Sequence, residues 1–210
     1  MKQRLLLLAA AALLCAALSG CRPEEQTSAK PVIYLYPTAE TEVTVTLDYG
    51  GRLTCTYPAY DGGWTVTAQP DGTLTDGGGQ TYQYLFWEGA DTAVYDFSQG
   101  FCIPGSGTAA FLEDALAQLG LSRREANEFI VYWLPRMEAN PYNLIAFQDE
   151  AYTEHAVLTV TPEPDSVLRV FMAWKRLESP VEVPAQPLPA FARTGFTVVE
   201  WGGAEVPQDH

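Results

Sequence analysis

Residues 122–137, SRREANEFIVYWLPRM, decide the fold of this chain. Large apolar side chains recur in this stretch at spacings of three and four residues, which is typical of one face of an α-helix. Ser122 followed by Glu125 predicts a capping box, and Pro135 predicts that the regular helix ends at Leu134. We expect the apolar face to be buried, and it consists of Ala126, Phe129, Ile130, Trp133, Leu134 and Met137.

A second helix is expected directly before this one. Thr108 is a candidate N-cap, and apolar residues follow it with helical spacing as far as Gly120, a residue type that often ends helices. Only Leu121 then separates the two segments. The pattern therefore predicts an αα-hairpin with helices at about residues 109–119 and 123–134.

Most of the remaining chain has the patterns of β-strands. Residues 32–36, VIYLY, form a continuous apolar run, which is typical of a central strand covered on both faces. Residues 42–49 alternate apolar and polar side chains, which predicts a half-exposed strand, and Gly50-Gly51 predicts a hairpin to residues 52–57. Further strands are expected at residues 64–68, 73–74, 81–87, 144–147, 156–161, 167–174 and 196–201, and residues 93–103 are expected to extend this β region with an interruption near Gly100.

The order of these elements sets the fold class. Strands precede the helical hairpin and strands follow it, which indicates one α+β domain. We expect a mostly antiparallel β-sheet or sandwich packed against the inserted αα-hairpin. The four prolines within residues 180–189 predict an extended connection over the surface.

The first 21 residues, MKQRLLLLAAAALLCAALSGC, are typical of a bacterial export signal, because a basic start precedes an apolar run and small residues. The end of this segment, LSGC, resembles the lipobox of bacterial lipoproteins. The resemblance implies cleavage after Gly20 and acylation of Cys21. Ordinary secretion with cleavage nearby is the alternative.

This interpretation divides the chain into four parts. We expect a signal peptide at residues 1–20, a lipidated tether at 21–30, a single domain at 31–203 and a flexible tail at 204–210. The domain would then lie on the extracytoplasmic face of the cell membrane, held by the lipid on Cys21.

The charge of the chain argues against some partners. There are 26 acidic and 12 basic residues, and the formal net charge is −14. Removal of residues 1–20 takes away two basic residues and no acid, which lowers the charge to −16. Such a surface repels phosphate backbones and anionic lipid heads, so we expect no nucleic-acid partner and no polybasic membrane contact.

Two cysteines remain once Cys15 is removed with the signal and Cys21 is acylated. Cys55 and Cys102 either form a disulfide, which is permitted outside the cytoplasm, or are two independent thiols. Neither lies in a CxxC motif, and histidine is scarce. The sequence therefore predicts no metal site and no cofactor.

Candidate chemistry is confined to carboxylates and aromatic rings. Glu150 and Glu154 could act as a glycosidase pair if they faced each other across a sugar. Oxygen-bearing residues between Asp71 and Asp76 could form a calcium loop, although a plain turn explains them. The rings that could stack on sugars are those of Tyr142, Tyr152, Trp87 and Trp201.

Several motifs resemble those of an uncharacterised family of bacterial secreted proteins and lipoproteins. They are KPVIYLYP (30–37), LTCTYP (53–58), YLFWEG (84–89), NEFIVYWLP (127–135), EAYTE (150–154) and GFTVVEWGG (195–203). The resemblance covers most of the chain after the signal. It implies one domain behind an export signal, and it supplies no catalytic residue.

Two functional hypotheses remain. The first is a lipid-anchored, non-enzymatic surface domain that binds a protein or glycan partner, and it predicts an exposed, contiguous aromatic patch. The second is an envelope hydrolase that uses Glu150 and Glu154, and it predicts that these carboxylates face a cleft about 5–10 Å apart.

Overall fold

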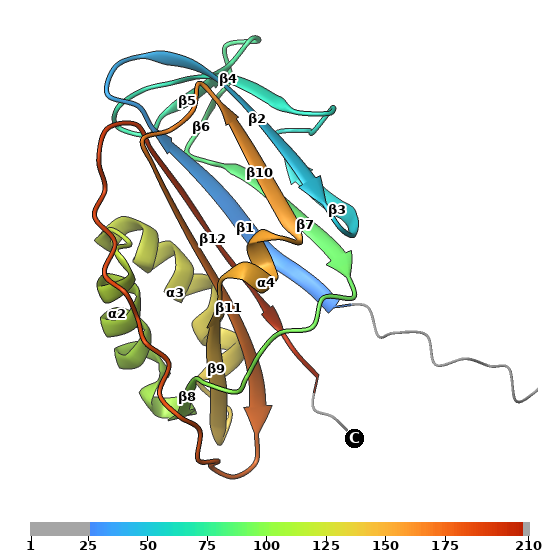
Figure 1. The fold of residues 1–210 in the computed structure, drawn as a ribbon, viewed down its shortest axis with the longest axis vertical. Coiled ribbons are helices and arrows are strands. Elements are labelled where there is room, and N and C mark those ends of the chain that lie inside the picture. Colours follow the sequence, from blue (N-terminus) through green and yellow to red (C-terminus); the bar gives the residue numbers. More distant parts are fainter. Residues whose placement is uncertain (1–25, 208–210) are drawn as a thin grey trace, which may run out of the picture.

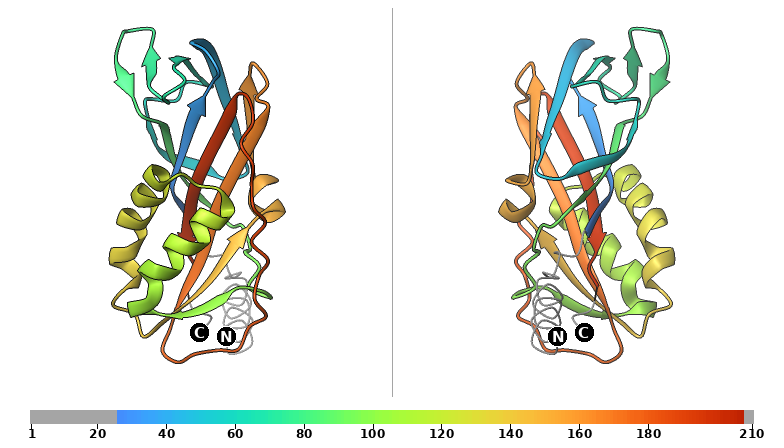
Figure 2. Two further views of the ribbon diagram at one scale, coloured as in Figure 1. Left: turned by 90° about the vertical axis from the view of Figure 1, so that its left-hand side faces the viewer. Right: turned by 90° about the vertical axis from the view of Figure 1, so that its right-hand side faces the viewer.

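The protein is built of three layers: a helical hairpin, a large β-sheet and a smaller β-sheet (Figure 1). The computed structural model describes residues 26–207. Figure 2 shows the helices on one side of the large sheet, with β10 and α4 on the other. Across these residues, no helix has the length and apolar character needed to span a membrane.

The large sheet has seven strands in the described chain, and neighbouring strands run antiparallel except for the parallel pair β11 and β12. In spatial order they are β3 (Arg52–Tyr57), β7 (Leu85–Asp91), β1 (Gln26–Tyr36), β12 (Thr197–Glu205), β11 (Ser166–Leu177), β9 (Tyr142–Gln148) and β8 (Phe101–Pro104). The smaller sheet contains β10 (Ala156–Thr161), β2 (Thr41–Tyr49), β4 (Trp64–Ala68), β5 (Leu74–Asp76) and β6 (Thr81–Tyr82).

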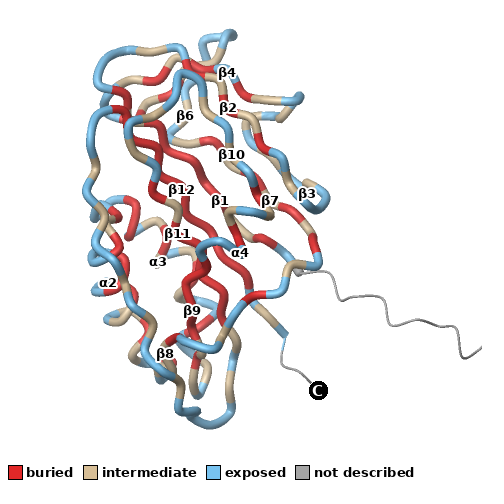
Figure 3. The backbone as a smooth tube through the Cα atoms, in the orientation of Figure 1, coloured by how far each residue is buried: buried red, intermediate tan, exposed pale blue. Residues whose placement is uncertain are grey.

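Strand β1 is the central strand that its apolar run predicts. Val32 and Tyr34 are buried in the core beneath the helices, whereas Ile33 and Leu35 are buried in the core between the two sheets. Consecutive side chains of a strand point to opposite faces, so a strand covered on both sides must be apolar throughout. Figure 3 shows that buried residues are concentrated in β1, β11 and β12. The predicted α+β fold class is confirmed.

The helical hairpin consists of α2 (Thr108–Leu119) and α3 (Arg123–Met137), and its start and turn follow the expected rules. The capping box of Ser122 and Glu125 is present, and Gly120 ends α2 with φ +98°, in the left-handed region. The predicted cap Thr108 is wrong, because a short 3₁₀ helix (Gly105–Gly107) leads into α2 and Thr108 is already helical.

The predicted end of α3 at Leu134 is also wrong, since the helix continues through Pro135 to Met137. Proline deprives the carbonyl four residues earlier of its donor. That residue, Val131, is 66% exposed, so water can serve its carbonyl. Arg136 then donates to the Tyr132 carbonyl, and the fully buried Met137 side chain holds the last turn on the sheet.

The contact between α3 and the large sheet depends on glycine. Phe129 and Trp133 are buried on the inner face of α3, and the ring of Phe129 lies edge-on to Trp201 at 5.2 Å. A Cβ atom on Gly203 would lie 2.7 Å from Trp133 Cζ2 and 2.5 Å from the Met172 carbonyl oxygen. Only a residue without a side chain therefore allows Trp133 to pack directly on β12.

Both predicted boundaries of the domain move outward. Gln26 to Ser28 pair with β7, so part of the predicted tether at 21–30 belongs to β1. Strand β12 continues to Glu205 with Ala204 buried, so the predicted tail does not begin at residue 204. The signal peptide, Cys21 and residues 208–210 lie outside the described residues.

The predicted hairpin at Gly50-Gly51 is wrong. Strand β2 pairs in the smaller sheet and β3 in the large one, so the two glycines carry the chain from one sheet to the other. A Cβ on Gly50 would lie 2.6 Å from His155 Cε1, and one on Gly51 would lie 2.5 Å from the Ala90 carbonyl oxygen. These glycines serve close packing, not a turn with positive φ.

The segments at residues 81–87 and 93–103 differ from the predicted strands, whereas the proline-rich segment follows its prediction. The strand expected at 81–87 is split into β6 and β7, which lie in different sheets, and only β8 of the expected 93–103 strand is regular. The proline-rich segment is the extended connection between the parallel strands β11 and β12.

The possible disulfide is ruled out. Cys55 lies on β3 and Cys102 on β8, which are opposite edges of the large sheet, and both are free thiols. Six strand spacings of about 4.8 Å separate these edges by roughly 29 Å. A bridge needs Cα atoms within about 7 Å of each other.

Substitution of Gly203 tests the contact between α3 and β12. We expect Gly203→Ala to lower the free energy of unfolding by about 3 kcal/mol, because Trp133 and the Met172 carbonyl must both move. Gly77→Ala is the matched control, since a Cβ there meets no atom within 4 Å, and it should cost less than about 0.5 kcal/mol. Urea unfolding measures both. Equal effects would contradict the close packing.

The state of the thiols is tested by alkylating the unfolded protein without prior reduction, followed by peptide mapping. The peptides that contain Cys55 and Cys102 should both carry the alkyl group, because the fold keeps the two residues on opposite edges. A cross-linked peptide that contains both residues would refute the strand order of the large sheet.

Candidate functional site

A groove with a volume of about 640 Å³ opens between the outer face of α3 and the strands beside it. This size lies within the range of about 300–1,000 Å³ that is usual for ligand sites. We call it the tyrosine groove. It is lined by Lys30, Tyr57, Thr81, Tyr82, Gln83, Tyr84, Glu128, Val131, Tyr132 and Arg136.

Helix α3 supplies one wall of the tyrosine groove. Glu128, Tyr132 and Arg136 follow each other at intervals of four residues, so they form one row along the helix. This row is adjacent to the buried face that contains Phe129 and Trp133. The packing of α3 on the sheet therefore also fixes the wall of the groove.

Lys30 occupies a strained position in the middle of β1. It is the only described non-glycine residue with positive φ, at +59°, and it lies where the register of β1 shifts against both neighbouring strands. Left-handed backbone costs an L-residue roughly 1–2 kcal/mol, and the following Pro31 restricts Lys30 further. Strained backbone of this kind clusters at active sites, ligand clamps and switch regions.

Aromatic rings surround the Lys30 ammonium group. Its Nζ atom lies 5.2 Å from the centre of the Tyr84 ring, 5.6 Å from that of Phe86 and 5.7 Å from that of Tyr132. The ammonium group also donates to the Tyr84 hydroxyl at 3.4 Å, and the backbone N–H donates to Glu88 Oε1 at 3.3 Å. The bulge in β1 thus directs a cation into the groove, where cation–π contacts hold it.

Arg136 is a second cation at the same site. Its Cζ atom lies 4.1 Å from the centre of the Tyr132 ring. Among the described carboxylates, none lies within ion-pair distance of Lys30 or Arg136. Glu128, which lines the groove, accepts a hydrogen bond from the Tyr34 hydroxyl at 2.8 Å and lies 3.6 Å from Arg124.

The tyrosines give the groove flat, neutral surfaces with hydroxyl groups. Tyr57 is 61% exposed, and its ring lies edge-on to Tyr82 at 5.4 Å. Burial raises the pKa of Tyr132 above its ordinary value, so its phenol is protonated at neutral pH and can donate a hydrogen bond. Of the four tyrosines, Tyr57 is exposed, whereas Tyr82, Tyr84 and Tyr132 are half-buried.

The aromatic residues that the sequence suggested for sugar stacking lie elsewhere. Trp87 and Trp201 are fully buried in the two cores, and Tyr152 is buried and stacked on Phe171 at 4.0 Å. Tyr142 is half-buried on β9. None of the four lines the tyrosine groove, and the three buried rings cannot stack on a ligand from solution.

Glu150 and Glu154 do not form the arrangement that hydrolysis needs. Both are exposed, and they are one turn apart at the short helix α4 (Glu150–Thr153), where the Glu154 N–H donates to the Glu150 carbonyl. Side chains four residues apart lie side by side, so they do not face each other across a sugar. Neither residue lines the tyrosine groove.

The possible calcium loop is a set of turns. The Asp71 carboxylate accepts the Thr73 N–H, and Asp76 accepts the N–H groups of Gly78 and Gln80 and the hydroxyl of Tyr82. Within residues 26–207, no group of three or more histidine, cysteine, aspartate or glutamate residues is placed to hold a metal ion.

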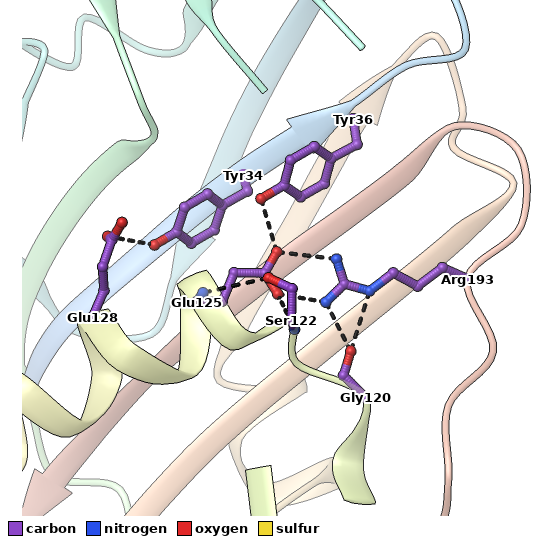
Figure 4. A network of polar contacts seen from close by, with 7 residues as sticks. All are labelled: Tyr34, Tyr36, Gly120, Ser122, Glu125, Glu128 and Arg193. Carbon is purple, nitrogen blue, oxygen red and sulfur yellow. Dashed lines mark hydrogen bonds and ion pairs between the residues drawn. The ribbon is translucent and has the colours of Figure 1, made fainter. Parts of the chain in front are cut away.

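A polar network fixes the N-terminus of α3 (Figure 4). Arg193, on the connection to β12, donates to Glu125 Oε1 at 3.0 Å and Oε2 at 2.5 Å, and to the Gly120 carbonyl at 2.8 Å. The Tyr36 hydroxyl donates to the same carboxylate at 2.8 Å. The network joins β1, α3 and the proline-rich connection, so it holds the helix that forms the groove wall.

Glu125 is ionised in this network although it is fully buried. Burial alone would raise the pKa of its carboxyl group. The hydrogen bonds from Arg193, from the Ser122 N–H and from Tyr36 outweigh burial and lower the pKa below its ordinary value.

Comparison with known proteins gives one informative match. A protein of Butyrivibrio fibrisolvens, described as "Uncharacterized protein in bglA 3'region", is 49% identical over 84 residues, which cover 37% of this chain and 86% of that protein. No protein-family model matches the chain. No solved structure matches it either.

Glu125 makes stability depend on pH. A carboxyl group with a lowered pKa in the folded state stabilises the protein fully above its unfolded pKa of about 4.3, and this stabilisation is lost as the pH falls through the folded pKa. The stability difference between the wild type and Glu125→Gln should therefore be constant from pH 5 to 8 and should shrink below about pH 4. Urea unfolding at each pH measures it.

Two arginine variants provide the control for this network. Arg193→Met should cost about 2–3 kcal/mol at pH 7, because it leaves a buried carboxylate without its main partner. Arg123→Met removes an exposed ion pair with Glu113 and should cost less than about 1 kcal/mol. A pH-independent difference for Glu125→Gln, or equal costs for the two arginine variants, would contradict the role of the network.

Proposed function

This chain belongs to the same family as the uncharacterized Butyrivibrio fibrisolvens protein, whose description names no activity, and we propose that it is a binding module held outside the cell by a lipid on Cys21. Its ligand lies in the tyrosine groove, and the domain performs no catalysis. The observation that carries this proposal is the groove itself, with its four tyrosines and the strained Lys30.

The composition of the groove supports binding. Tyrosine combines a large apolar ring with a hydroxyl that donates and accepts, and it loses little conformational entropy when it contacts a ligand. The four tyrosines come from β3, from β6, from the segment between β6 and β7, and from α3, so strands and a helix hold three of them in position before a ligand arrives. Such preorganisation raises affinity.

The alternative is an envelope hydrolase that acts through Glu150 and Glu154. It has less support, because these exposed carboxylates lie side by side on α4 and away from the tyrosine groove. The carboxylate within the groove, Glu128, already accepts from Tyr34 and lies beside Arg124. Its place in these contacts favours a structural role over proton transfer.

The proposed anchor sets the position of the groove. Only residues 22–25 separate Cys21 from the start of β1 at Gln26. Five fully extended residues span at most about 18 Å, so the domain would lie close to the outer surface of the membrane. Polymers and proteins of the cell envelope are then the ligands within reach.

The anchor is tested by growing a bacterial host that expresses the full chain with radiolabelled palmitate. The wild type should carry the label and fractionate with the membrane, whereas Cys21→Ser should carry none. A soluble and unlabelled wild type would reject the anchor without bearing on the groove.

Ligand binding is tested by applying the full chain, in detergent, to immobilised panels of oligosaccharides and peptides. We expect at least one ligand class to be retained, and Tyr57→Ala to weaken its retention at least tenfold. Tyr142→Ala is the matched control, because Tyr142 lies on β9 outside the groove. No retention, or equal loss in both variants, would reject the tyrosine groove as the site.

A further inference from the structure

Within residues 26–207, two cations in the tyrosine groove form no ion pair, in contrast to several arginines of the same part of the chain. Among the described residues, Arg123, Arg169 and Arg193 each form an ion pair with a glutamate. Lys30 and Arg136 form none with a described carboxylate, although acidic residues outnumber basic ones by 26 to 12. Both instead lie within 6 Å of the centre of the Tyr132 ring.

The groove is locally positive in a negative protein. Lys30 and Arg136 line it, and Arg124 lies at its margin beside Glu128. The nearby acids are Glu128 in the lining and Glu88, which accepts the Lys30 N–H, so these cations outnumber these acids by three to two. At physiological ionic strength charges are screened over about 8 Å, so distant carboxylates affect a ligand in the groove less than these cations do. The local charge complements an anion.

The backbone at Lys30 adds an independent argument. A glycine would adopt φ +59° without strain, yet the chain has lysine there and places its ammonium group among three rings. The bulge in β1 and the positive φ of Lys30 coincide with this placement of the ammonium group. A strained residue whose side chain points into a groove is typical of a ligand contact.

The lining also indicates which class of molecule the negatively charged ligand belongs to. Four tyrosines, Thr81 and Gln83 offer groups that donate and accept hydrogen bonds, as a ligand rich in hydroxyl groups requires. The tyrosine rings offer flat apolar faces for the C–H surface of a sugar ring. Val131 is the one aliphatic residue in the lining, so a peptide would find few apolar side-chain pockets.

We propose that the tyrosine groove binds an anionic glycan, a sugar chain that carries carboxylate or phosphate groups. Its sugar rings lie against Tyr57, Tyr82 and Tyr84, and its negative groups contact Lys30 and Arg136. This inference rests on the proposed function of the groove as a binding site. It adds the class of the ligand and the residues that select it.

Calorimetric titration of the full chain in detergent tests the inference. The probes are trigalacturonate, a phosphorylated maltotriose, the methyl ester of trigalacturonate and plain maltotriose. We expect at least one charged probe to bind at least tenfold more tightly than its uncharged counterpart. Raising the salt concentration from 50 to 500 mM should reduce that difference. The charged probe that binds identifies the anion.

Variants separate charge recognition from folding. Lys30→Gly suits the positive φ, and Arg136→Gln removes the charge but keeps a polar side chain at an exposed position, so both should remain folded by circular dichroism. Each should weaken binding of the charged probe at least tenfold and should weaken any binding of the uncharged probe much less. Arg123→Gln, outside the groove, should change neither.

Other outcomes overturn the inference. Equal affinity for charged and uncharged sugars, with binding still lost in Tyr57→Ala, would refute the anionic ligand and leave the proposed function intact. Tighter binding of a hexaglutamate peptide than of either charged sugar would replace the glycan with an acidic peptide. No binding of any sugar would refute the glycan, and the array panels would then show whether the groove binds anything else.

Discussion

The contact between Trp133 and Gly203 is the constraint on which the rest of the structure depends. Because β12 has no side chain at position 203, the Trp133 ring packs directly on its backbone, and α3 lies closer to the sheet than a larger residue would permit. The neighbouring row of α3, with Tyr132 and Arg136, is thereby fixed at the edge of the helix layer. Packing of the inner face therefore determines the position of the functional face.

The tyrosine groove forms where all three layers meet. Helix α3 supplies one wall, β6 of the smaller sheet supplies another, and the bulge of β1 in the large sheet places Lys30 between them. The polar network around Glu125 joins β1 and α3 a short distance away (Figure 4). Since packed elements and a buried ion pair hold every wall, the site requires little reorganisation to receive a ligand.

Sequence rules predicted correctly those features that are determined by residues close together in the chain. The capping box, the turn at Gly120 and the apolar run of β1 each depend on a few neighbouring residues, and all three are present. The extension of α3 beyond Pro135 could not be predicted in this way, because it depends on the exposure of Val131 and the burial of Met137.

Strand pairing is a tertiary property, and the sequence was misleading there. Gly50-Gly51 has the composition of a hairpin turn, yet the two strands beside it lie in different sheets. Likewise, the tail was predicted to begin at residue 204, although β12 continues to Glu205 and Trp133 packs directly on Gly203. A glycine that serves close packing has the same local signature as one that serves a turn.

The binding residues were missed for a similar reason. Lys30, Tyr57, Tyr84 and Tyr132 are far apart in the chain, and no spacing rule connects them. Three of the four aromatic residues that the sequence did suggest, Trp87, Trp201 and Tyr152, are core residues. Residue type alone does not distinguish a buried ring from one that stacks on a ligand. No local signal marked Lys30, because a residue before proline favours extended backbone, and only the structure shows its positive φ.

The most direct test of this account is an NMR titration of the isotope-labelled full chain, in detergent, with trigalacturonate. The account predicts that backbone amide shifts change together at Lys30, at residues 81–84 and at residues 131–136, which surround the tyrosine groove. Amides near Glu150 on α4 should stay unchanged. Shift changes confined to α4, or spread evenly over the domain, would contradict the assignment of this groove as the binding site.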